Sequence, residues 1–174
     1  MRIRAVQACE LPVLQEIERA AGQPFADIGM VEIAQDEPYP LAVLAACEQA
    51  GLLWVTADEA DRPVAYLMAS VVDECLHIDQ VSVHPDSARR GLGRALLDHA
   101  AGRAATDGLA ALTLTTFASV PWNAPYYRRC GFRVLGEAEL TLACGRSAST
   151  KPGSGSINGP GCACAAISKL AGRP

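Results

Sequence analysis

The chain contains no long apolar run, no excess of positive charge and no internal repeat. Its longest apolar windows are only as long as a strand, and no hydrophobic stretch follows Met1 and Arg2. We therefore expect no membrane span and no signal peptide. The formal net charge of -4 gives no electrostatic support to nucleic-acid binding. The 174 residues are 50% apolar, an ordinary globular composition that predicts one domain with a substantial core.

Cysteine occurs seven times, but never in the spacing of a metal or redox site. There is no Cys-x-x-C motif, and the close pair Cys162 and Cys164 lacks the companions that a tetrahedral zinc site requires. We therefore expect no metal. The odd number of cysteines fits a reducing compartment, so we expect the protein in the cytoplasm.

The C-terminal part of the chain lacks acidic and aromatic residues. None follows Glu139, and Gly, Ser, Pro, Ala and Cys dominate. This composition predicts a domain over residues 1–143 and a low-complexity tail over 144–174, disordered in the simplest interpretation. The alternative is an out-of-frame tail, because codons permitted for Cys144 to Ala166, read one base earlier, can encode LRPIREHEARLGLDQWPRVCMRR. A domain without its final strand would expose a sheet edge, a route to self-association that makes a homodimer the assembly to consider.

Periodicity and turn residues predict the element order β-α-α-β-β-β-α-β-α-β. This order predicts an α/β fold, with a mixed, mostly antiparallel sheet, a central βαβ crossover and helices on both faces. On the first helix, Glu16, Glu18 and Arg19 are expected to form a solvated face. Strands and helices are expected at residues 3–6, 10–21, 41–50, 52–57, 63–72, 76–83, from the glycine loop to 106, 109–117, 124–130 and 132–143.

Residues 84–97, HPDSARRGLGRALL, carry the strongest signal for a binding site. They connect a strand-like apolar run to a helix, and a helix start leaves backbone N–H groups and a positive dipole end available to an anion. Gly91 and Gly93 remove Cβ atoms where a phosphate must approach the backbone. The charge comes from Arg89, Arg90 and Arg94. This pattern predicts a pyrophosphate site.

A nucleotide-phosphate binder is a rival interpretation of the same loop. It is disfavoured because no Lys-Ser/Thr follows the glycines and no acidic residue lies at the distance expected for a ribose contact.

Three segments taken together are more specific than the loop: HIDQVSV at residues 77–83, the loop at 84–93 and YYRRCGF at 126–132. They resemble the GNAT superfamily of N-acetyltransferases, and the resemblance extends over residues 2–142. It implies the GNAT-like form of the mixed sheet. It also implies direct transfer of an acetyl group from acetyl-CoA to a primary amine of a small molecule or protein in a ternary complex. The alternative is a non-catalytic acyl-CoA-binding sensor or interaction module.

The resemblance also implies how acetyl-CoA would be held. Backbone groups near Val81, Ser82 and Val83 would bond the pantetheine and polarise the thioester carbonyl. The family's usual Gln or Arg is replaced by Ala88, so one side-chain contact is missing. Asn123 is either the cap of the following helix or a pantetheine contact, and capping is the interpretation we favour. The residues expected around the pyrophosphate are Arg89, Arg90, Gly91, Leu92, Gly93 and Arg94.

Acetyl transfer requires a base for the ammonium and an acid for the departing thiolate. The resemblance implies Tyr127 as the acid, with a purely packing role as the alternative. Alternation along the strand puts His77 and Asp79 on one face, so His77 is the candidate base, with Asp79 as its partner or as a water-ordering carboxylate. The alternative is a satisfied polar pair without catalytic role. Glu74 is a third candidate, better explained as a solvated turn residue.

The acceptor amine is expected to bind against residues 23–40, which are mostly irregular in sequence pattern. Their acidic excess favours a cationic amine, such as a polyamine, an aminoglycoside, an amino acid, a protein N-terminus or a lysine. The acidic residues are Asp27, Glu32, Asp36 and Glu37.

Overall fold

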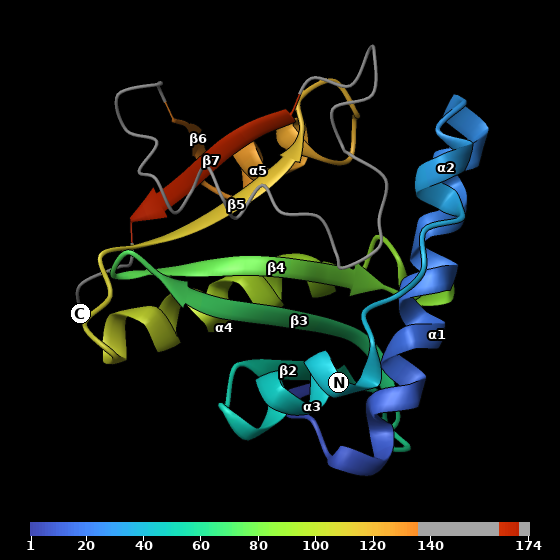
Figure 1. Cartoon of the computed structure of the whole chain (residues 1–174), viewed down its shortest axis with the longest axis horizontal. Coiled ribbons are helices and arrows are strands. Elements are labelled where there is room, and N and C mark those ends of the chain that lie inside the picture. Colours follow the sequence, from blue (N-terminus) through green and yellow to red (C-terminus); the bar gives the residue numbers. More distant parts are fainter. Residues whose placement is uncertain (136–163, 171–174) are drawn as a thin grey trace. The chain divides into compact units, whose positions relative to one another are not determined.

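A computed structural model describes residues 1–135 and 164–170 of the chain (Figure 1). The described residues form two compact units, each built from separate stretches of sequence. Residues 1–69 and 80–96 belong to the first unit, and residues 70–79, 97–135 and 164–170 to the second. None of the helices in these described stretches has the length and apolar character needed to span a membrane.

In the first unit, β1, β2 and β3 are successive neighbours in the sheet, and the pairs β1–β2 and β2–β3 are antiparallel. The register pairs Ile3 with Thr56 and Val55 with Tyr66. All five residues of β2 are buried, so both faces of this sheet are covered. The strands are β1 (Arg2–Ala5), β2 (Leu53–Ala57) and the larger part of β3 (Pro63–Val72).

Helices follow β1 in an almost continuous series. The helix α1 (Leu11–Gly22) is preceded by the short η1 (Ala8–Glu10) and continues into η2 (Gln23–Ile28). The predicted helix over residues 10–21 is confirmed, because α1 ends at Gly22 and a separate 3-10 helix follows it. The backbone turns only at Gly29, whose φ of 79° lies in the left-handed region that glycine adopts without strain. Two more helices follow, α2 (Val31–Ala34) and α3 (Leu41–Gln49).

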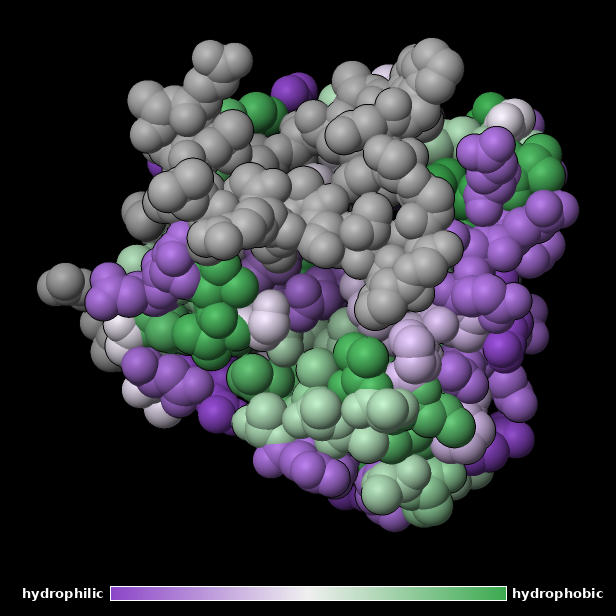
Figure 2. Space-filling view, in the orientation of Figure 1, coloured by the Kyte–Doolittle hydropathy of each residue, from purple (hydrophilic) through white to green (hydrophobic). Residues whose placement is uncertain are grey.

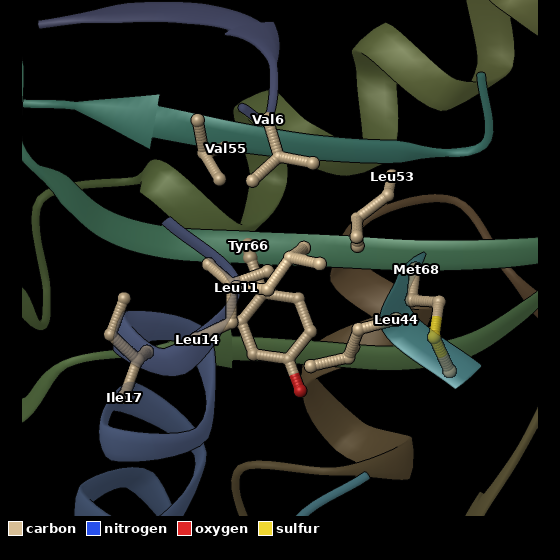
Figure 3. Close-up of a cluster of buried hydrophobic side chains, with 9 residues drawn as sticks. All are labelled: Val6, Leu11, Leu14, Ile17, Leu44, Leu53, Val55, Tyr66 and Met68. Carbon is tan, nitrogen blue, oxygen red and sulfur yellow. The ribbon is translucent and has the colours of Figure 1, made fainter. Parts of the chain in front are cut away.

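Apolar side chains from α1 and α3 pack on one face of the first unit's sheet (Figure 3). Helical spacing brings Leu11, Leu14 and Ile17 to the same side of α1, as predicted. Full burial of side chains of this size stabilises the fold by about 1.5–3 kcal/mol each. The cluster consists of Val6, Leu11, Leu14, Ile17, Leu44, Leu53, Val55, Tyr66 and Met68.

The second unit contains the βαβ crossover. Strand β4 (Cys75–Val83) begins here, α4 (Leu92–Thr106) ends here, and β5 (Ala111–Phe117) pairs parallel with β4 through Leu76–Leu112 and Ile78–Leu114. The pairs β1–β2 and β2–β3 of the first unit are antiparallel. The predicted fold class, a mixed and mostly antiparallel sheet with a central crossover, is confirmed.

The C-terminal part of the second unit differs from the sequence prediction. Residues 164–170, which composition places in the tail, form β7 (Cys164–Leu170), antiparallel to β5 and to the short β6 (Arg133–Val134). An unpaired edge of β5 offers backbone N–H and C=O groups to any extended segment of the chain. Amino-acid composition alone cannot predict that residues 164–170 pair with this edge. The predicted strand over residues 132–143 begins with β6, and its remainder lies outside the described residues.

Candidate functional site

The glycine loop of the first unit is anchored before it reaches its arginines. His84 follows β4, and its N–H donates to the carbonyl oxygen of Val64 on β3 at 2.9 Å. Its imidazole Nδ1 accepts a hydrogen bond from the N–H of Asp86 at 3.3 Å and so caps η3 (Pro85–Ser87). His84 therefore stabilises the start of the loop through its backbone N–H and its imidazole.

The loop turns through left-handed backbone at its centre. Arg89 has φ 60° and Gly91 has φ 77°, a region that only glycine adopts freely. A Cβ built on Gly91 would meet no atom of residues 1–135 or 164–170 within 4 Å, so these residues leave the space above this backbone open. The positive φ of Gly91 is compatible with its predicted role, the close approach of a phosphate to the backbone.

Helix α4 starts directly after this turn. Ala95 N–H bonds to the carbonyl of Gly91 at 3.0 Å, so the N–H groups of the preceding residues have no intrahelical acceptor. The side chain of Leu92 is buried, so only its backbone is available to an anion. The three predicted arginines, Arg89, Arg90 and Arg94, are exposed. Exposed cations and helix-start N–H groups can bind a pyrophosphate.

The end of β4 in the first unit alternates as the sequence predicts. Val81 and Val83 are partly exposed, whereas Ser82 is buried. The hydroxyl of Ser82 accepts a hydrogen bond from Gln80 Nε2 at 2.9 Å. Because this side chain is buried and bonded within the protein, any contact of Ser82 with a ligand would come from its backbone.

The beginning of β4, in the second unit, carries the two candidate bases. His77 is only 3% exposed, and its Nδ1 lies 2.9 Å from Oγ1 of Thr113 on β5. Burial lowers the pKa of His77 to about 4. The ring is therefore neutral at pH 7 and a weak base. The predicted partnership with Asp79 is not formed, because Thr113 takes the histidine instead.

Asp79 has a different environment. It is half-buried, and the hydroxyl of Ser70 on β3 donates to its Oδ1 at 3.2 Å. Burial raises the pKa of Asp79 to about 6, although the hydrogen bond from Ser70 acts in the opposite direction. A carboxylate with this pKa is mostly ionised at neutral pH and still basic enough to take a proton. Asp79 is therefore better suited than His77 to act as the general base.

Tyr127 lies on α5 (Ala124–Arg129) between two other rings. Its ring packs edge-on against Tyr126 at 5.5 Å and Phe132 at 5.7 Å between centroids. Burial raises the pKa of Tyr127 above its ordinary value, so the phenol is protonated at neutral pH and able to donate. Packing and proton donation are thus compatible in this side chain.

Asn123 stands at the N-cap of α5, but its side chain makes no capping bond, so that favoured interpretation is wrong. Pro125, at the second helical position, has no N–H, which removes one of the two backbone donors that an N-cap side chain can accept from. The backbone carbonyl of Asn123 accepts from the N–H of Tyr127 at 3.0 Å. Glu74 is exposed in a turn, as predicted.

Residues 23–40 form a surface of mixed character in the first unit. Ile28 and Val31 are exposed apolar side chains beside the exposed carboxylates of Asp27 and Glu32. The space-filling view shows hydrophobic and hydrophilic residues side by side over α2 (Figure 2).

The sequence did not predict Ser70 and Thr113 as the hydrogen-bond partners of Asp79 and His77, because a hydroxyl residue in a strand carries no distinctive sequence signal. Glu18 was placed on a solvated face, and this was wrong: it is 5% exposed. Its spacing after Leu14 puts it on the buried side of α1, so helical periodicity could have identified it.

Residues 13–132 match the sequence model of the Acetyltransferase (GNAT) family. The chain is 31% identical over 88 residues to the peptidyl-lysine N-acetyltransferase YjaB of Escherichia coli strain K12, covering 51% of this chain and 54% of that protein. It is 38% identical over 80 residues to the ribosomal protein bS18-alanine N-acetyltransferase of Salmonella typhimurium, covering 46% and 53%. The chain thus matches about half the length of these curated relatives.

Among solved structures, the chain is similar to the ribosomal-protein-S18-alanine N-acetyltransferase from Escherichia coli. The TM-score is 0.66 at 20% sequence identity, over 99% of this chain and 95% of that one. At this identity the similarity shows the fold alone.

Proposed function

The chain belongs to the Acetyltransferase (GNAT) family, and from this premise we propose that it transfers the acetyl group of acetyl-CoA to a primary amine of a protein or peptide. The observation that carries the proposal is the loop before α4, with its left-handed Gly91, its open backbone and its three exposed arginines. These features fit a diphosphate, the group that distinguishes coenzyme A from a simple thioester.

Acetyl-CoA would bind through backbone more than through side chains. N–H groups of Gly91, Leu92, Gly93 and Arg94 would hold the pyrophosphate, with the guanidinium groups of Arg89, Arg90 and Arg94 around it. Backbone groups of Val81, Ser82 and Val83 would bond the pantetheine amides. The amide of Asn123, which caps no helix, would be a further contact. When bound, acetyl-CoA supplies an activated acyl group, and we propose no metal.

The second unit would supply the proton transfers. Asp79 accepts a proton from the substrate ammonium, which frees the nitrogen lone pair to form the new C–N bond. As the C–S bond breaks, Tyr127 donates its proton to the sulfur, and the proton lost by the acylated nitrogen restores the phenol. One proton is released overall, held by Asp79 until it reaches solvent. His77 stays neutral, keeps its hydrogen bond to Thr113 and takes no proton from the substrate.

A protein amine is the acceptor that we favour over a small molecule. The relatives named above are a peptidyl-lysine N-acetyltransferase and an N-acetyltransferase of an alanine of ribosomal protein bS18. Residues 23–40 contain four acidic residues and no basic one, so they suit a cationic amine. Exposed Ile28 and Val31 would contact apolar residues of a peptide rather than a polyamine or an aminoglycoside.

Two further proposals concern the cellular compartment and the oligomeric state of the enzyme. The described cysteines Cys9 and Cys130 are free thiols, which supports a reducing compartment such as the cytoplasm. A homodimer remains the proposed assembly, and sedimentation equilibrium tests it.

Two measurements test the proposed activity. Isothermal titration of the full chain with coenzyme A should show saturable heat, and a thiol-release assay should show turnover with lysine or N-terminal alanine peptides but less with polyamines. Absence of heat on folded protein would contradict the proposal. Binding without turnover on any amine would favour the non-catalytic sensor.

A further inference from the structure

A carboxylate is buried in the apolar core of the first unit. Glu18 lies on α1 among Leu14 and Ile17, and only 5% of it is exposed. Removing a carboxylate from water costs several kcal/mol unless hydrogen bonds compensate, and a well-packed apolar pair is often at least as stable. The position of Glu18 therefore calls for an explanation beyond stability.

Glu18 connects two segments far apart in sequence. Its Oε2 accepts a hydrogen bond from the hydroxyl of Tyr66 on β3 at 2.6 Å and another from the backbone N–H of Tyr39 at 3.2 Å. The carbonyl of Tyr39 is held from the same helix, by Gln15 Nε2 at 2.8 Å. Two side chains of α1 thus fix both polar groups of one peptide residue, at the end of residues 23–40.

The strand that carries Tyr66 is the neighbour of β4 in the sheet. The backbone N–H of His84, directly after β4, donates to the carbonyl of Val64, two residues before Tyr66, at 2.9 Å. Burial and the neighbouring Glu18 carboxylate raise the pKa of Tyr66, so the phenol keeps its proton and donates it to Glu18. Glu18 therefore accepts from β3 on one side and from Tyr39 on the other.

We propose that Glu18 is a positioning residue that, through Tyr66, sets residues 23–40 in register with the Gln80–Val83 end of β4. The inference rests on the proposed function, which assigns the acceptor to residues 23–40 and the pantetheine to Val81, Ser82 and Val83. It deepens that function, because acceptor binding then depends on a carboxylate that does not touch the substrate.

The direct test is the substitution Glu18→Gln, which keeps the shape and removes the charge. The amide oxygen can take the place of Oε2 and still accept both hydrogen bonds, but it carries no full negative charge, and the NH2 group takes the place of Oε1. We expect KM for an acceptor peptide to rise about tenfold, the effect of weakening two charge-assisted hydrogen bonds, and KM for acetyl-CoA to change less than twofold. Glu16→Gln removes the same charge from an exposed position of α1 and should change neither constant.

Two further measurements keep the test decisive. Tyr66→Phe should reproduce the KM split, and the double variant should be no worse than Glu18→Gln alone, because both changes act on the same hydrogen bond. Hydrogen exchange at the Tyr39 amide should accelerate in Glu18→Gln and not in Glu16→Gln. This readout needs no substrate.

Equal changes in both KM values, or a lower melting temperature with unchanged kinetics and unchanged Tyr39 exchange, would overturn the positioning role. Wild-type protein that neither binds coenzyme A nor turns over would contradict the proposed function instead. The two failures are therefore distinguishable.

Discussion

The glycine loop and the start of β4 prepare for chemistry in opposite ways. The loop exposes its arginines and offers backbone N–H groups, so most of its binding capacity survives replacement of any one side chain. His77 and Asp79 are buried or half-buried, and their proton affinities are set by burial. The comparison teaches that a single substitution should be costly in the second region and moderate in the first.

The largest effect is expected from Asp79→Asn, which removes the group with a pKa of about 6. Because the base works only when ionised, the rate of the wild type should fall as pH drops through 6 and level off above it. The variant should lose about 100-fold or more in kcat and lose this pH limb. A pH–rate profile of both proteins measures this. A variant that keeps the limb would assign the base elsewhere.

A smaller loss is expected from Tyr127→Phe, which keeps the ring packing on Phe132 and removes the acid. We expect kcat to fall about 100-fold at most, with little change in coenzyme A affinity. Steady-state kinetics and calorimetry on the same preparation separate the two. Tyr126→Phe is the matched control, and equal losses in both variants would indicate a packing role for Tyr127.

In the loop, Gly91→Ala forces an alanine into φ 77° at a cost of about 1 kcal/mol. We expect coenzyme A to bind about fivefold more weakly, because the turn that presents the backbone N–H groups relaxes. Gly102→Ala is the control: it lies inside α4, has room for a Cβ, and should stabilise the helix. If Gly91→Ala bound coenzyme A as tightly as the wild type, the left-handed backbone at Gly91 would not be needed for coenzyme A binding.

The smallest effect on rate is expected from His77→Gln. The imidazole is neutral over the working pH range, because its pKa is about 4, so it contributes no titration near neutrality. The amide can keep a hydrogen bond to Thr113, and kcat should change less than tenfold. A pH limb displaced by this substitution would restore His77 as the base.

Sequence reasoning reached the fold class and the loop because both follow local rules. Strand alternation placed Val81 and Val83 on one face and Ser82 on the other, and the glycine pattern marked Gly91 as a position without Cβ. Sequence reasoning could not decide between His77 and Asp79 as the base, because the pKa values of both depend on burial by distant elements. It also misjudged Glu18, whose stabilising partners Tyr39 and Tyr66 are far along the chain.

The region after residue 143 remains a prediction in two respects. The domain boundary there and the reading frame of the tail are not decided by β7, since a paired strand can form from either a native or a shifted sequence. If the frame is shifted, sequencing of the gene should reveal an inserted or deleted base, and the intact mass of protein from the corrected gene should differ. An in-frame gene encoding this same tail would end the idea.

The backbone nitrogen of Pro125, near the start of α5, connects the stability of this helix with the proposed affinity for coenzyme A. Because Pro125 lacks an N–H, the Asn123 amide at the head of α5 stays uncommitted to the helix. Substituting alanine for this proline would add an N–H at the second helical position, from which the Asn123 side chain could accept a capping hydrogen bond. Under the proposed contact of Asn123 with the pantetheine, this substitution should stabilise α5 and weaken the binding of coenzyme A.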